Sequence, residues 1–91
     1  MEVCFYANLR PLVGADRVEL ELERGATVRS LLGELLRRWP ALGEHLVTAE
    51  GELSRRVNLF VEGRNARWLQ GEATPLDGVA QVDLFPPVAG G

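Results

Sequence analysis

Lysine is absent from this sequence of 91 residues, and all ten of its basic residues are arginines. Thirteen acidic residues give a formal net charge of -3 at pH 7. This balance argues against general nucleic-acid binding, which needs a clustered surplus of basic side chains to neutralise phosphates. A chain without lysine also cannot accept an acyl group on a lysine side chain, so it cannot build lysine-linked chains of itself. A mildly acidic, soluble protein that binds no nucleic acid is expected.

Cysteine and histidine each occur once, as Cys4 and His45. One cysteine cannot form an internal disulfide, and neither residue has the spacing of a catalytic triad or a metal site. We interpret Cys4 as a small strand residue and His45 as a surface residue. None of the strands predicted below is followed by the glycine pattern that binds phosphate. We therefore expect a protein that is not an enzyme by itself and that binds no metal or cofactor.

Long hydrophobic runs are also missing. A membrane-spanning helix needs roughly 18 or more consecutive apolar residues, and neither such a run nor a signal-peptide pattern occurs. We therefore expect no membrane association and a cytoplasmic location. Ninety-one residues is the size of one ordinary domain, and 46% of them are apolar. The predicted organisation is a single domain over residues 1-85 followed by a flexible C-terminal tail over residues 86-91.

Two segments near the N-terminus alternate apolar and polar residues, as half-buried strands do. In residues 2-8, Val3, Phe5 and Ala7 share the expected core face. In residues 18-23, apolar residues alternate with glutamates without a break. The acidic row that this creates has two interpretations, the solvated face of an edge strand or a docking ridge for a basic partner.

A helical period replaces the alternation in residues 28-38. Apolar residues recur at offsets 0, 3, 4, 7, 8 and 11, which places on one stripe Val28, Leu31, Leu32, Leu35, Leu36 and Trp39. Thr27 is the expected N-cap, and Pro40 disfavours helical geometry at the residue before it. These signals predict one main helix.

The remainder is expected to be mostly strands. Residues 41-56 suggest an irregular connection that has room for one more helical turn, and residues 57-62 alternate as a third strand. Gly63-Arg64-Asn65 is typical of a tight turn into a short strand over 66-69, and the last strand covers 81-85. The order β-β-α-β-β-β predicts an α+β fold in which a mixed sheet of four to five strands wraps around one main helix.

The C-terminal segment after the last predicted strand has no charged side chain. It reads Pro86, Pro87, Val88, Ala89, Gly90 and Gly91. Prolines favour extended geometry, so six residues at about 3.1 Å each would project the last glycine roughly 19 Å from the sheet, into a pocket of another protein. Glycines fit a narrow channel and leave the terminal carbonyl open to attack. A carboxylate must first be activated, most simply as an acyl-adenylate made by a separate ATP-using enzyme. The plain alternative is a frayed or truncated end.

The chain resembles the ubiquitin-like β-grasp family that comprises the small subunit of molybdopterin synthase (MoaD) and the thiamine-pathway sulfur carrier (ThiS). The resemblance covers essentially the whole chain. It rests on residues 5-10, Thr27-Val28, residues 57-65 and, most specifically, the closing segment 85-91. Two departures are Val79-Ala80, where the family has an acid-rich run, and a longer connection at 41-56, which disfavours the thiamine branch.

This resemblance implies that an activating enzyme similar to the ubiquitin-activating type (MoeB-like) adenylates Gly91 with ATP. A sulfurtransferase or cysteine desulfurase then supplies sulfur, which Gly91 holds as a covalent thiocarboxylate. The tail enters the large synthase subunit (MoaE-like), where the sulfur passes to a cyclic pterin phosphate precursor. Three alternatives stay open: a ubiquitin-like modifier that acylates lysines, a sulfur donor for tRNA thiolation, and a β-grasp interaction module with an inert tail.

Phe60 and Phe85 fall on the polar faces of the third and last strands. If these strands are neighbours, the two rings form an apolar patch beside the tail, and such patches commonly mark interfaces. The alternative is that one of the rings packs under a loop.

Overall fold

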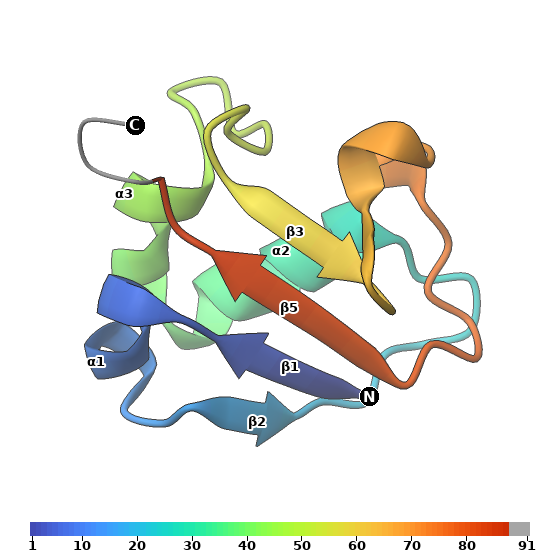
Figure 1. The fold of residues 1–91 in the computed structure, drawn as a ribbon, viewed down its shortest axis with the longest axis horizontal. Coiled ribbons are helices and arrows are strands. Elements are labelled where there is room, and N and C mark those ends of the chain that lie inside the picture. Colours follow the sequence, from blue (N-terminus) through green and yellow to red (C-terminus); the bar gives the residue numbers. More distant parts are fainter. Residues whose placement is uncertain (88–91) are drawn as a thin grey trace.

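The computed structural model describes residues 1-87 and contains a five-stranded mixed sheet that packs one face against a main helix (Figure 1). The strand order is β2-β1-β5-β3-β4. The strands are β1 (Glu2–Phe5), β2 (Arg17–Glu19), β3 (Asn58–Val61), β4 (Arg64–Asn65) and β5 (Gln81–Phe85). β5 is parallel to β1, and the other three pairings are antiparallel. This arrangement confirms the predicted mixed sheet around one main helix.

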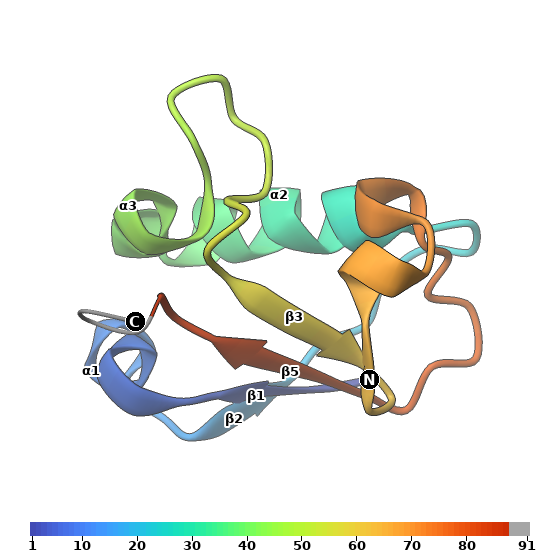
Figure 2. The same cartoon turned by 45° about the horizontal axis from the view of Figure 1, so that its top comes forward.

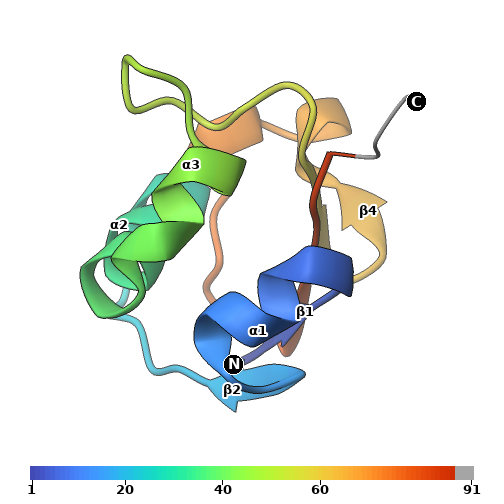
Figure 3. The ribbon, with the colours of Figure 1, turned by 90° about the vertical axis from the view of Figure 1, so that its left-hand side faces the viewer.

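The helices lie mainly on one side of the sheet. They are α1 (Arg10–Val13), α2 (Val28–Arg38) and α3 (Gly43–Leu46), with 3-10 turns η1 (Ala7–Leu9), η2 (Pro40–Leu42), η3 (Ala66–Trp68) and η4 (Gly71–Ala73). Figure 2 shows α2 and α3 above the same face of the sheet, whereas α1 lies beside the end of β1 in Figure 3. Among residues 1-87, no helix is both long enough and apolar enough to cross a membrane.

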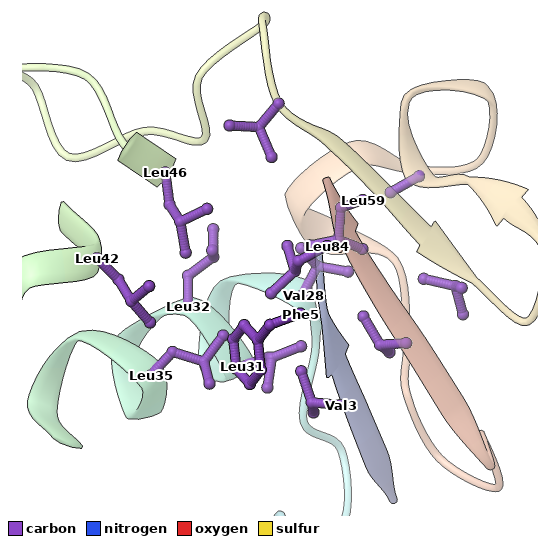
Figure 4. Close-up of a cluster of buried hydrophobic side chains, with 14 of the residues drawn as sticks. Val3, Phe5, Val28, Leu31, Leu32, Leu35, Leu42, Leu46, Leu59 and Leu84 are labelled. Carbon is purple, nitrogen blue, oxygen red and sulfur yellow. The ribbon is translucent and has the colours of Figure 1, made fainter. Parts of the chain in front are cut away.

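The hydrophobic core lies between α2 and the inner face of the sheet (Figure 4). Four members of the predicted helical stripe are buried, and Leu36 and Trp39 are half-buried at its edge. The facing side chains come from strands far apart in sequence, including Val3, Phe5 and Leu84. Burial of each of these aliphatic or aromatic side chains stabilises the folded state by about 1.5–3 kcal/mol. The packing of these side chains is therefore the main interaction that holds α2 on the sheet.

The ends of α2 follow the sequence signals. The Thr27 backbone N–H donates to the Ser30 hydroxyl oxygen at 3.0 Å, and the Thr27 side chain accepts from the Ser30 backbone, which completes a capping box. The helix ends at Arg38, two residues before Pro40, as predicted.

One predicted strand was too long and another was wrong, both for local reasons. Residues 2-8 form a strand only as far as Phe5, because the chain then coils into η1 and α1, where a proline occupies the first helical turn. Ala7 is consequently exposed instead of lying on the core face, and it adopts a positive φ of 52°. The predicted strand 66-69 is the 3-10 turn η3, because the Asn65 side chain accepts a hydrogen bond from the Arg67 N–H at 2.9 Å and closes a turn.

Two other segments also differ from their predicted form. β2 ends at Glu19, although the alternation continues to Glu23 and Leu20 is still buried. Residues 41-56 are helical at their start, where η2 and α3 bury Leu42 and Leu46 in the core. Half-buried His45 therefore belongs to a short helix and not to an irregular loop.

Truncation of the central α2 side chain should destabilise the fold. We expect Leu31→Ala to lower the free energy of unfolding by about 2–5 kcal/mol, because Leu31 is fully buried. Gly33→Ala in the same helix is the matched control. A Cβ at Gly33 would meet no atom within 4 Å, so alanine should raise stability by about 0.5–1 kcal/mol. Urea denaturation of both variants measures these changes. Equal stability of the two variants would contradict the assigned core.

Candidate functional site

The C-terminal segment leaves the fold from the middle of the sheet. β5 is hydrogen-bonded to β1 on one side and to β3 on the other, so its last residues are fixed on both flanks. Pro86 directly after it is buried, and Pro87 is half-buried. Proline fixes φ near -65°, so the direction in which the chain leaves β5 is restricted. The predictions for Val88, Ala89, Gly90 and Gly91 concern residues outside the described part of the chain.

Three aromatic side chains form what we call the outer-face cluster, on the sheet face opposite α2. Its members are Tyr6, Phe60 and Phe85. The Phe85 ring stacks on Tyr6 with centroids 4.1 Å apart and planes 12° apart, and it meets Phe60 edge-on at 5.5 Å and 89°. All three residues are half-buried. Stacked and edge-on aromatic pairs contribute about 0.5–1.5 kcal/mol beyond their buried area, so the cluster fixes the end of β5.

Polar contacts hold the Tyr6 ring in this position. Its hydroxyl donates to Asp83 Oδ1 at 2.9 Å, and Gln81 Nε2 donates to the same oxygen at 2.9 Å. The Arg10 guanidinium lies 5.6 Å from the Tyr6 ring centroid, within range of a cation–π contact, while its Nε donates to the Phe5 carbonyl oxygen at 2.9 Å. The hydrogen bond to Asp83, together with burial, raises the pKa of Tyr6 above its ordinary value.

The sequence predicted part of this cluster. Phe60 and Phe85 are on neighbouring strands, as expected, and their rings are in contact. Tyr6 was assigned to the polar face of its strand, but nothing in the local sequence joined it to Phe85. The parallel pairing of β1 with β5, in register Phe5 to Leu84, brings the two rings together. The use of Phe60 and Phe85 as a partner interface remains a prediction.

Cys4 has the environment of a structural thiol. Burial is the largest cause that raises its pKa, and a contact of 3.6 Å from Sγ to Glu2 Oε1 adds to this effect. A reactive cysteine needs a lowered pKa, so Cys4 is a poor nucleophile at neutral pH. Within residues 1-87, no three histidine, cysteine, aspartate or glutamate side chains gather in a way that could hold a metal ion.

The acidic row begins with Glu19 on the edge strand β2 and continues into the chain after this strand. Glu19, Glu21 and Glu23 are exposed. Glu19 accepts a hydrogen bond from the Met1 amine at 3.1 Å. These observations agree with the solvated edge interpretation, and the docking-ridge alternative stays a prediction.

The model of the ThiS family matches residues 3–91, almost the entire chain. The chain belongs to the ThiS family. Small archaeal modifier protein 3 of Haloferax volcanii is 36% identical over 91 residues, which cover all of this chain and 98% of that protein. A putative sulfur carrier protein of Archaeoglobus fulgidus is 34% identical over 74 residues, which cover 81% of this chain and 83% of that protein.

Solved structures agree with this membership. The crystal structure of SAMP1 from Haloferax volcanii has a TM-score of 0.86 and 30% identity, and the match covers 100% of this chain and 98% of that chain. The fold of this ThiS-family member is therefore the ubiquitin-like β-grasp, as predicted. The relatives are named as carriers or modifiers, which places the chain among small ubiquitin-like carrier proteins.

The tyrosine hydrogen bond in the outer-face cluster should be visible in a titration. Tyr6 is the only tyrosine, so the phenolate absorbance reports on this residue alone. We expect Asp83→Asn to shift its pKa downwards, towards the ordinary value, because the carboxylate that opposes deprotonation is removed. Glu62→Gln, which removes an exposed carboxylate elsewhere, should leave the titration unchanged.

The sign of the linked stability effect follows from this raised pKa. The stabilisation of the fold by the hydrogen bond from Tyr6 to Asp83 is fully present below the pKa that Tyr6 has in the unfolded chain. It is lost as the pH rises through the pKa of Tyr6 in the folded chain. Identical tyrosine titrations of the unaltered chain and Asp83→Asn would contradict the assigned contact.

Proposed function

We propose that this ThiS-family chain carries sulfur on the carboxyl group of Gly91 and delivers it, as the small subunit of molybdopterin synthase, to a cyclic pterin phosphate precursor. One observation carries the proposal: the segment that ends in Gly90-Gly91 follows the central strand of the sheet directly, beyond buried Pro86 and half-buried Pro87. The fold thereby fixes the point from which these last residues begin. The full-length match to the ThiS family supports the same chemistry.

The sulfur chemistry begins with activation. The Gly91 carboxylate attacks the α-phosphorus of ATP in an activating enzyme similar to the MoeB type, pyrophosphate leaves, and an acyl-adenylate forms. A persulfide, supplied by a sulfurtransferase or cysteine desulfurase, attacks the carbonyl carbon, and AMP leaves. A further thiol then reduces the resulting sulfur–sulfur bond and releases the thiocarboxylate. Each step uses groups on partner proteins, and this chain supplies the carboxyl group and a defined route to it.

The tail residues and the outer-face cluster have separate roles in this proposal. Pro87, Val88, Ala89 and Gly90 enter a channel of the partner, whereas Pro86, which is buried in this chain's own fold, marks the point where the tail begins. In the MoaE-like large subunit, this brings the Gly91 thiocarboxylate to the pterin precursor. The side chains of the outer-face cluster contact the partner beside the channel, because partly exposed aromatic side chains next to the reactive terminus are suited to protein interfaces.

A second candidate is a protein modifier. The name of one Haloferax volcanii relative, small archaeal modifier protein 3, favours this candidate. The first adenylate is the same, but a lysine ε-amine of another protein attacks the carbonyl carbon and forms an isopeptide bond. Sulfur donation for tRNA thiolation would use the same thiocarboxylate as the pterin reaction. An inert interaction module, in contrast, would keep its activity after deletion of Gly90-Gly91.

Intact mass spectrometry tests the sulfur carrier directly. In protein purified from its native host, we expect a shift of about +16 Da that maps to the C-terminal peptide, because sulfur replaces one carboxylate oxygen. Oxidation of Met1 gives the same nominal shift, so fragments must locate it. Deletion of Gly90-Gly91 should abolish the tail-localised shift without unfolding the domain.

The alternative outcomes separate the candidates. A free carboxylate together with Gly91 linked to lysines of other proteins would favour the modifier and contradict the carrier. Pterin sulfuration that requires the thiocarboxylated chain and the large subunit in a reconstituted reaction supports the molybdopterin assignment. Full activity of the Gly90-Gly91 deletion would support the inert module.

The outer-face cluster can be tested separately from the tail. We expect the double variant Phe60→Ala/Phe85→Ala to weaken binding to the partner that receives the tail by more than about tenfold, because two apolar contacts are lost. Leu22→Ala, which truncates a half-buried side chain outside the cluster, is the matched control. Calorimetric titration measures affinity, and thermal melting checks the fold. Unchanged affinity of a folded double variant would remove the cluster from the interface.

A further inference from the structure

An unusually exposed tryptophan lies at the opposite edge of the sheet from the acidic row. Trp68 is 78% exposed at the end of η3, and the next residue, Leu69, is 37% exposed. The turn η3 follows the edge strand β4 and appears in orange in Figure 1. Tryptophan is usually well buried, and an exposed aromatic side chain with an apolar neighbour indicates a contact surface. The core does not require this ring.

Four arginines precede the tryptophan in residues 55-67, and the fold places Arg55, Arg64 and Arg67 in or beside η3. We call Arg55, Arg56, Arg64, Arg67 and Trp68 the Arg–Trp surface. The Arg67 guanidinium donates to the Arg55 carbonyl oxygen, and both residues line one surface hollow with Asn65. A second hollow beside β4 is lined by Arg64 and Leu69. The two hollows flank η3, which ends at Trp68.

The charges of the Arg–Trp surface are not neutralised within residues 1-87. Five other arginines form ion pairs there, namely Arg10, Arg17, Arg29, Arg37 and Arg38, whereas the four of this surface form none. Two carboxylates are nearby. Glu62 is exposed beside Arg64, and Glu72 is occupied by Arg29 at 3.6 Å and by the Leu53 N–H at 3.2 Å. Residues 53-70 contain four arginines and one glutamate in a chain of net charge -3.

The chemistry of this surface fits an acidic protein segment. The planar guanidinium group of arginine binds a carboxylate with two parallel hydrogen bonds. Tryptophan and arginine are also enriched among the residues that contribute most to binding at protein interfaces. A long nucleic acid would be repelled by the net negative charge of the remaining surface. The surface also begins near the exit of the tail: Asn58 pairs with Phe85, and Arg56 lies two residues before Asn58.

We propose that the Arg–Trp surface docks an acidic segment of the ATP-using enzyme that activates Gly91. This inference rests on the proposed function, because activation is the first step of every carrier and modifier mechanism considered above. The enzyme must hold the C-terminal residues while it presents ATP, so it covers the end of the sheet where the tail leaves. An acidic segment that runs from its tail channel along β3 then meets the arginines from Arg56, near the tail exit, to Arg64, which pairs with Val61 at the other end of β3. The Trp68 ring fills an apolar recess of that segment.

The experiment measures activation of the full-length chain by the purified activating enzyme of the same organism, as ATP–pyrophosphate exchange. Trp68→Ala and the double variant Arg56→Glu/Arg64→Glu should each raise the KM for the carrier by about tenfold or more at low salt, with kcat unchanged at saturation. Arg24→Glu makes half of this charge change, as either substitution alone would, at another exposed arginine and should alter KM by less than about twofold. The effect of the double variant should shrink as salt is added, because salt screens exposed charges.

The outcomes distinguish this proposal from the function on which it rests. Exchange with equal KM values for all folded variants would overturn the docking surface and leave the carrier function intact. Absence of exchange with the unaltered chain would overturn the carrier function and the docking proposal together. Tight binding of a single-stranded RNA oligonucleotide that is lost in Trp68→Ala, with unchanged KM for activation, would assign the surface to nucleic acid instead.

Discussion

The pairing of β5 between β1 and β3 is the constraint on which the rest of the structure depends. It joins the two ends of the chain, because β1 begins at Glu2 and β5 ends at Phe85. A parallel pair needs a long connection, and here that connection contains α2, whose apolar stripe covers the inner face of the sheet. Loss of the β1–β5 pairing would separate the sheet into two parts and expose the core.

The same strand builds the core with one face and the candidate site with the other. Val82 and Leu84 point inwards and are fully buried, whereas Asp83 and Phe85 lie on the outer face, where they contact Tyr6. This alternation follows from the period of a strand. It means that the start of the tail is positioned by the packing of the core itself. A carrier that reacts through its last residues would benefit from this arrangement, because the tail that the partner receives starts from a fixed position on the domain.

The parts of the fold that could be predicted are those with a local signal. α2 is marked by six apolar residues at helical spacing, by Thr27 as N-cap and by a following proline, and all these signals fall within residues 27-40. β3 and β5 have clean alternation and were located within one residue at each end. The strand predicted at 66-69 failed because one side chain, Asn65, closes a turn that competes with extended backbone.

The site could be predicted only where one segment contains it. The Gly90-Gly91 end is contiguous, so the hypothesis of its activation follows from residue types alone, and it stays a prediction because these residues lie outside the described part of the chain. The stack of Tyr6 on Phe85 joins residues 79 positions apart, and the sequence does not state which strands are parallel neighbours. The Arg–Trp surface was missed for a different reason, because its residues are close in sequence but their exposure is not a local signal. Only the exposure of Trp68 and the missing ion pairs within residues 1-87 distinguish its arginines from an ordinary solvated surface.

The side chains of this protein are consistent with a carrier that does not react with its own activated C-terminus. An acyl-adenylate reacts with thiolates and amines, so a carrier that displays such groups would be acylated by another copy or by its own tail. The single cysteine has a raised pKa and is half-buried among the side chains of β1 and its neighbours. Lysine is absent, and arginine stays protonated and is a poor nucleophile. The lysine and arginine positions of the chain are therefore all arginines, which can bind carboxylates without competing for the activated glycine.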